Sequence, residues 1–150
     1  MTPLTRIILA AGAALSLACG DDDGNGPNRN SLVGTWDATS MEFVLRTNPA
    51  VRVDVVAEFD ATVTVVLDDD DTFSVLVQVP GEPAQLITGT WSVDGNTMTL
   101  NPDGEPFDWQ FAVSLSGNTL TLEGGDVEFD VDDDGDEDEC DLNLVLDRVL

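Results

Sequence analysis

Lysine, histidine and tyrosine are absent from this 150-residue chain, and five arginines are its only basic side chains. Thirty acidic residues stand against them, giving a formal net charge of −25 at pH 7. This imbalance argues against nucleic-acid binding, because basic groups must replace the counterions of a phosphate backbone. It also disfavours direct adsorption to an anionic membrane surface. A cation or a basic partner suits the charge better, and a soluble, monomeric protein is the simplest alternative.

The same absences bear on catalysis. Without histidine, lysine and tyrosine, the usual general bases and Schiff-base groups are missing, which leaves carboxylates, hydroxyls and thiols. No spacing singles out a catalytic pair of carboxylates. We therefore expect that the protein is not an enzyme.

The N-terminus has the pattern of a targeting segment. Arg6 precedes twelve apolar or small residues, 7–18, which match the length of a signal-peptide core and are too short to span a bilayer. The segment ends in Leu15-Ser16-Leu17-Ala18-Cys19, which resembles the lipobox of bacterial lipoproteins. The resemblance implies removal of residues 1–18 and acylation of Cys19. Ordinary secretion and a short membrane segment are the alternatives.

The lipobox resemblance also implies a location. Several acyl chains would attach the protein to a membrane, since each buried methylene contributes about 0.8 kcal/mol. In that family an aspartate directly after the cysteine retains the protein in the inner membrane. Gly20 stands there in this chain, so the outer membrane of a bacterial cell envelope is favoured. Residues 19–30 are rich in Asp, Gly and Asn and predict a flexible tether, which leaves residues 31–150 as one domain.

Acylation of Cys19 would leave Cys140 without a disulfide partner in an oxidising compartment. No histidine is available to activate its thiol. We therefore expect Cys140 to be buried and inert, with pairing between molecules as the alternative.

Alternation of apolar and polar residues dominates the domain and predicts strands. The clearest example is 107–115, where Phe107, Trp109, Phe111, Val113 and Leu115 share one face. Further strands are predicted at 36–45, 62–67, 73–79, 87–93, 98–100, 120–122, 127–131 and 142–146. Residues 48–59 fit either a strand or a short helix.

Two near-identical segments, 93–100 and 115–122, carry Asp-Gly-Asn-Thr and Ser-Gly-Asn-Thr between apolar runs. Such turns predict tight hairpins, and no helix is long enough for a crossover. The fold class is therefore all-β, an antiparallel up-and-down meander that closes into an eight- to nine-stranded barrel. A β-sandwich is the alternative.

Gly34-Thr35-Trp36 opens the first predicted strand and resembles the G-x-W element of lipocalins and their bacterial lipocalin-like relatives. The resemblance implies that Trp36 closes one end of a barrel and that an arginine of the last strand stacks on it. Arg148 is in phase with Leu142, Leu144 and Leu146 and is the expected partner. The motif recurs as Gly89-Thr90-Trp91, where the family does not have it.

A barrel of eight strands either is filled by side chains or holds one small ligand. Phe73, Trp91, Phe107, Trp109 and Phe111 are expected to point inward together with Trp36 and Phe129. These aromatic residues favour two readings, a filled core and the lining of a cup for a small apolar ligand.

An acidic segment precedes the last predicted strand. Asp130, Asp132 and Asp134 alternate ahead of Gly135, and carboxylates spaced in this way in a tight loop converge on a calcium ion. We expect Ca²⁺ to bind to Asp130, Asp132, Asp134, Asp136, Asp138 and Asp141, with Asp136 acting through its carbonyl. The strand-like flanks exclude an EF-hand, and a solvated acidic loop is the alternative.

Two classes of non-catalytic function follow from these patterns. One is an envelope-anchored lipocalin-like carrier of a small apolar ligand, which requires a cavity of several hundred cubic ångströms. The other is a structural or interaction module of the envelope with a packed barrel and a calcium-stabilised acidic hairpin.

Overall fold

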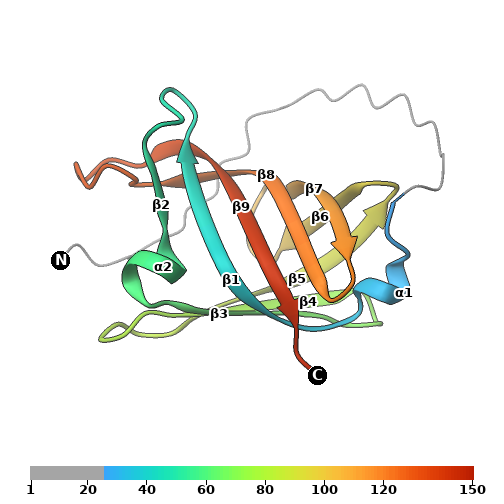
Figure 1. Cartoon of the computed structure of the whole chain (residues 1–150). Helices are drawn as coiled ribbons and strands as arrows, with labels where there is room; N and C mark the ends of the chain where they lie inside the picture. The colour runs from blue at the N-terminus through green and yellow to red at the C-terminus, as the bar shows by residue number, and fades with distance from the viewer. Residues whose placement is uncertain (1–25) are drawn as a thin grey trace.

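The computed structural model describes residues 26–150, so the predicted signal peptide, Cys19 and the start of the predicted tether lie outside the described residues. Nine strands and two short helices form the described part of the chain (Figure 1). No helix within it is long and apolar enough to cross a bilayer.

The strands are ordered as a meander in which nearly every strand pairs with its neighbours in sequence. Their bounds are β1 Gly34–Leu45, β2 Arg52–Asp54, β3 Thr62–Leu67, β4 Thr72–Gln78, β5 Gln85–Asp94, β6 Thr97–Pro102, β7 Trp109–Ser116, β8 Thr119–Phe129 and β9 Asp138–Arg148. The helices are α1 Arg29–Leu32 and α2 Val55–Phe59.

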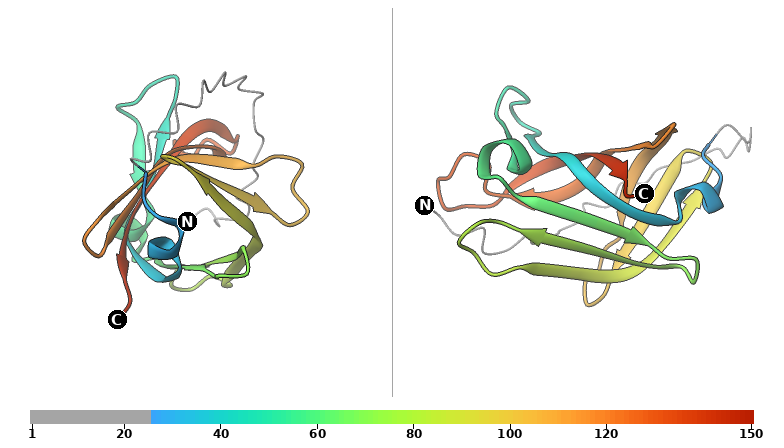
Figure 2. Two further views of the ribbon diagram at one scale, coloured as in Figure 1. Left: turned by 90° about the vertical axis from the view of Figure 1, so that its right-hand side faces the viewer. Right: turned by 60° about the horizontal axis from the view of Figure 1, so that its bottom comes forward.

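Strand β1 closes the sheet into a barrel. Its start pairs with β3, and its other edge pairs antiparallel with β9 from Trp36 opposite Arg148 to Leu45 opposite Cys140. The short strand β2 pairs with the far part of β1 and is additional to the eight strands of the closed barrel. The strands surround a common interior when viewed along the barrel (Figure 2). The predicted antiparallel barrel is therefore confirmed, and the sandwich alternative is wrong.

The two ends of the barrel differ. Helix α1, Trp36 and Arg148 lie at one end, which we name the closed end. The other end carries the β1–β2 loop 46–51, helix α2, the β4–β5 loop 79–84 and the β8–β9 connection (Figure 1). We name this second end the mouth.

Both predicted hairpins are present, as β5–β6 and β7–β8. Gly95 and Gly117 have φ angles of 58° and 60° at their turns. Positive φ is accessible to glycine without the steric penalty that a Cβ brings, so these two residues explain why the similar sequences turn alike.

Strand β8 differs from the prediction. Residues 120–122 and 127–131 were expected as two strands, but they belong to one strand that ends at Phe129 and is interrupted by a bulge between Leu122 and Gly125. Gly124 has a φ of 78°, and its N–H donates to the Asn143 side chain at 2.9 Å. The glycine pair therefore bends one continuous strand between the two segments that were predicted as separate strands.

Residues 48–59 contain both of the expected alternatives, β2 followed directly by α2. Asp54 ends the strand and caps the helix, since its carboxylate accepts from the N–H groups of Val56 and Ala57 at 3.0 and 3.3 Å. The same carboxylate accepts from Ser40 Oγ at 2.6 Å, which fastens α2 to β1 at the mouth.

Alternate side chains of the strands fill the interior with a single apolar cluster. The prediction that Phe107 joins this face was wrong, because its side chain is 42% exposed. Strand β7 begins only at Trp109, which pairs with Leu100, and Phe107 lies in the preceding loop after Pro106. Proline has no N–H to donate to a neighbouring strand, so Pro106 disfavours strand pairing next to Phe107. The alternating sequence pattern therefore starts at Phe107, two residues before the strand itself starts.

Candidate functional site

The closed end is built around the first G-x-W motif. The Trp36 side chain is fully buried, and its indole N–H donates to the Leu32 carbonyl at 2.9 Å. The Arg148 guanidinium lies 4.2 Å from the centre of the ring and also donates to the carbonyls of Val33, at 3.0 Å, and Ser31. This is the arrangement that the lipocalin resemblance implies.

Gly34 completes the closed end. Its φ is 146°, and a Cβ at this position would lie 2.7 Å from Arg148 Nη1. The first residue of the motif is therefore glycine both for its backbone angle and because the guanidinium occupies the adjacent space.

Side chains fill the barrel interior, including four of the five aromatic residues predicted to line a ligand site. Phe73, Trp91, Trp109 and Phe111 are at most 4% exposed. A more open and largely polar hollow of about 330 Å³, which includes Asp60, Thr62 and Gln78, lies on the surface at the mouth. The recess within the barrel at this end is about 20 Å³, which is room for about one water molecule. Its lining consists of Met41, Phe43, Val55, Val77, Val79, Glu82, Pro83, Gln85 and Phe129. The stacked rings of Phe43 and Phe129, with centroids 4.1 Å apart, fill most of this end.

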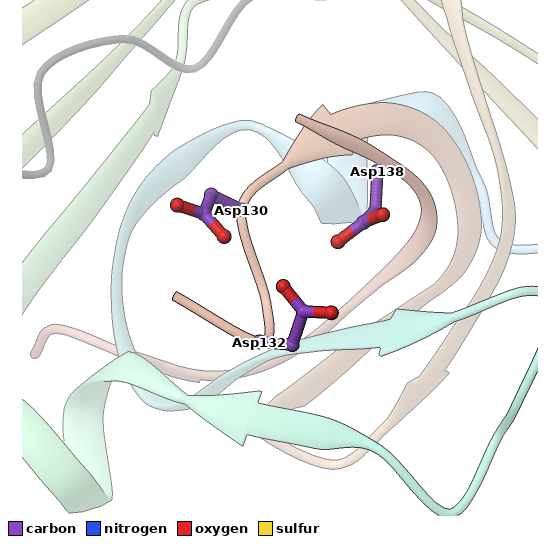
Figure 3. A group of neighbouring side chains, drawn as sticks. All are labelled: Asp130, Asp132 and Asp138. Carbon is purple, nitrogen blue, oxygen red and sulfur yellow. The ribbon is translucent and has the colours of Figure 1, made fainter. Parts of the chain in front are cut away.

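The acidic hairpin, residues 130–138, consists of the β8–β9 connection and the first residue of β9, and it follows directly on Phe129 of this recess. Carboxylate oxygens of Asp130, Asp132 and Asp138 lie within 4.8 Å of one another (Figure 3). The backbone folds around Asp130, whose carboxylate accepts from the N–H groups of Asp134 and Gly135 at 3.1 and 3.0 Å. Three carboxylates at such spacing match the hard oxygen ligands that Ca²⁺ prefers.

The carboxylates of three of the six predicted calcium ligands, Asp134, Asp136 and Asp141, lie outside this group. The Asp134 carboxylate turns back to accept the N–H of Asp136 at 2.8 Å. Asp141 lies on β9 and forms an ion pair with Arg46 Nε at 2.9 Å, so its prediction as a ligand was wrong. The strand carries Asp141 away from the loop, whereas the twelve-residue calcium-loop pattern would return it to the ion.

Asp138 is the electrostatically unusual member of the group. Burial raises its pKa above the ordinary value, and the nearby charges of Asp132, Asp134 and Asp130 raise it further. Its Oδ2 atom is shielded from solvent and has no hydrogen-bond partner in the described structure. A divalent cation would reduce the repulsion between these carboxylates and would provide the Asp138 Oδ2 atom with a partner.

Arg46 was not recognised from the sequence as part of this region. It comes from the β1–β2 loop and pairs with Asp126 at 3.0 Å as well as with Asp141. The pairing joins strands that close the barrel, so only the β1–β9 register, with Val44 opposite Asp141, reveals it.

Cys140 is buried, as expected for an inert thiol. Burial raises the pKa of its thiol to about 11, and the nearby charge of Asp138 acts in the same direction. We expect no reaction of Cys140 with a thiol reagent such as DTNB at pH 8, because only the thiolate is nucleophilic. The measurement uses a Cys19→Ser variant, so that Cys140 is its single thiol. Unfolding in guanidinium chloride should expose Cys140 and restore a normal rate, whereas fast labelling of the folded variant would contradict its burial.

The described start of the chain differs from the predicted tether. The Asn28 side chain caps α1 by accepting the N–H of Asn30 at 2.9 Å, and Arg29 begins the helix. The predicted boundary between residues 30 and 31 therefore falls inside α1.

The sequence of the chain matches the model of a known protein family. Residues 32–122 match the family model described as a lipocalin-like domain, which covers more than half of the chain. No curated protein matches the chain. The matched region ends before the acidic hairpin and β9, so the hairpin lies beyond the part that the family model describes.

Proposed function

Since this chain belongs to the lipocalin-like domain family, a family with a ligand-binding fold, we propose that it is a non-catalytic module of a bacterial cell envelope. In this proposal acyl chains on Cys19 attach it to the outer membrane, its packed barrel is a rigid monomeric scaffold, and its acidic hairpin binds Ca²⁺. The packed interior is the observation that supports a module over a carrier.

The recess of about 20 Å³ is far below the size of a ligand site, which typically measures about 300–1,000 Å³. Enlarging it would require displacement of Phe43 or Phe129, which stack against each other and are at most 8% exposed. Moving one of these rings would lose close packing that the interior cannot recover.

Calcium binding is supported by the convergence of Asp130, Asp132 and Asp138. With a dissociation constant of about 10⁻⁴ M, as in extracellular calcium modules, about 10 mM calcium should stabilise the fold by about 2.7 kcal/mol. The melting temperature should therefore rise by about 10 °C, and EDTA should reverse the rise. An unchanged melting temperature in a folded sample would remove the metal from the proposal.

Asp138→Asn separates metal binding from general screening of charge. In EDTA the variant should melt several degrees above the wild type, because it removes a repelled carboxylate without changing the side-chain shape. With calcium it should show a smaller further rise, because a neutral amide oxygen is a weaker calcium ligand than a carboxylate. Asp94→Asn, which changes an exposed acid at the end of β5, is the matched control and should retain the full calcium response.

The raised pKa of Asp138 also predicts a pH dependence in EDTA. Because the folded-state pKa lies above the unfolded-state value, the folded chain holds this proton more tightly. The contribution of Asp138 to stability should become less favourable as the pH rises through its folded-state pKa. The Asp138→Asn variant should lack this component, and equal pH profiles for the two proteins would contradict the assignment.

Carriage of a small apolar ligand is the second candidate, and the apolar recess at the mouth favours it. A neutral apolar dye such as N-phenyl-1-naphthylamine should gain fluorescence with the wild type if the mouth opens to admit it. Val77→Trp, which fills the recess, should then abolish the signal. A wild type that leaves the dye dark, and whose lipid extract contains no bound compound, supports the packed module.

A further inference from the structure

The G-x-W motif occurs twice, and the two tryptophans have partners of the same kind. The Trp91 indole is buried like that of Trp36, and its N–H donates to the Asp68 carbonyl at 2.9 Å. An arginine lies over this ring as well, with the Arg29 guanidinium 4.8 Å from its centre. The second arginine comes from the start of the described chain, not from the last strand.

The Arg29 guanidinium contacts three groups. The guanidinium lies over the Trp91 ring, and Arg29 Nη2 donates to the Asp69 carbonyl at 3.1 Å and to the Asp71 carboxylate. The Asp71 backbone is held in turn, since its carbonyl accepts the N–H of Trp91 at 2.8 Å. A planar guanidinium fits this set of partners, because it can stack on an indole while it donates hydrogen bonds within its own plane.

The residues that follow Arg29 are also held. The carbonyls of Ser31 and Val33 accept from Arg148, and the Leu32 side chain is fully buried. Helix α1 lies across the closed end, on the opposite side of the barrel from the acidic hairpin (Figure 2). The chain therefore enters the barrel at the closed end and is fastened there by two arginine–tryptophan contacts.

We propose that the Arg29–Trp91 contact is a clasp that orients the barrel on the membrane, with the closed end toward the bilayer and the mouth away from it. The inference rests on the acylation of Cys19 in the proposed function. The eight residues 20–27 then separate the anchor from the capped start of α1, and they span at most about 28 Å. Strand β1, with 12 residues, is about 40 Å long, and a strand tilt of about 40° makes the barrel about 30 Å tall, so even the fully extended tether does not exceed the height of the barrel.

Charge supports the same orientation. The segment 126–141 at the mouth contains eleven acidic residues and no basic one, whereas the acidic β3–β4 turn 68–71 at the closed end has four and is partly neutralised by Arg29, so an anionic bilayer repels the mouth more strongly. The acidic hairpin would consequently face the aqueous compartment, where calcium and any basic partner reach it.

The test uses the full-length protein, produced and processed in a bacterial host, in liposomes that contain an anionic lipid and a headgroup-labelled energy acceptor. A donor dye is attached to Asn118→Cys, in the β7–β8 turn of the closed end, or to Thr47→Cys, in the loop at the mouth. Both positions are exposed, and wild-type protein should take up little dye because Cys140 is buried. Energy transfer should be several-fold higher from position 118 than from position 47.

Arg29→Ala should reduce this difference, and Arg29→Lys should restore it only in part, because a lysine cannot stack as a guanidinium does. Arg52→Ala removes an exposed arginine paired with Glu42 on the mouth side and should leave the difference unchanged. Equal transfer from both positions in the wild type would overturn the orientation. An Arg29→Ala result equal to the wild type would overturn the clasp. Protein that does not float with the liposomes would instead contradict the acylation of Cys19 and hence the proposed function.

Discussion

Replacing Trp36 with alanine is expected to lower the free energy of unfolding by about 4 kcal/mol, the cost typical of deleting a fully buried aromatic side chain. The expected loss of stability is large because the substitution removes three stabilising interactions at once. The apolar ring leaves a cavity, the Leu32 carbonyl loses its indole donor, and Arg148 loses the ring on which it stacks. For a domain of this size the melting temperature should fall by about 15 °C.

Urea unfolding followed by far-UV circular dichroism measures this effect, because it does not depend on the remaining tryptophans. Arg148→Met keeps the ring buried and should cost less, about 1–2 kcal/mol, through the lost contacts to Ser31 and Val33. The double variant should cost less than the sum of the two single variants, because both remove the same stacking contact. Strict additivity would contradict a direct coupling of Trp36 and Arg148.

Gly125→Ala is expected to destabilise the fold by about 3 kcal/mol, at the upper end of the usual cost of overpacking a core. A Cβ at this position would lie 2.2 Å from Cε1 of Phe111, which is closer than any real contact. The Phe111 ring is 1% exposed and surrounded by the packed interior, so it cannot move aside without loss elsewhere. Thermal unfolding should detect a fall of about 10 °C.

The cause can be tested by making room for the added methyl group. Phe111→Leu should itself destabilise, but in its presence Gly125→Ala should cost clearly less than it does alone. Gly117→Ala is the matched control, because its Cβ would meet nothing within 4 Å and it should cost only the about 1–2 kcal/mol of a positive φ angle. If Gly125→Ala were no worse than Gly117→Ala, the ring contact would not be the cause.

Most of the fold was predictable because the signals that encode it are local. Alternation places Phe73, Phe111 and Leu144 inside without knowledge of any distant residue, and Gly95 and Gly117 mark their turns by their own backbone preference. The errors occur where a local pattern has two physical outcomes. Gly124-Gly125 could end a strand or bulge it, and only pairing along the full length of β9 selects the bulge.

The candidate metal site was predictable only in its compact part. Asp130 and Asp132 are close in sequence, and Asp138 faces Phe129 across the hairpin, so a tight loop brings the three together. Asp141 could not be assigned correctly, because its partner Arg46 is 95 residues away and reaches it only through the β1–β9 pairing.

Local chemistry along the chain thus decided that this protein is an antiparallel β meander with apolar aromatic residues on one face, an acidic hairpin and an arginine in phase with the last strand. Closure of the barrel decided the rest, because it brings residues more than 100 positions apart into contact, as at Trp36 and Arg148. Closure also fixed the volume of the interior, and that volume together with the inward side chains determines whether a cavity remains. The periodicity of the sequence does not encode the volume that remains inside the barrel. The filled core and the stacking of Arg29 on Trp91 are therefore properties of the tertiary structure.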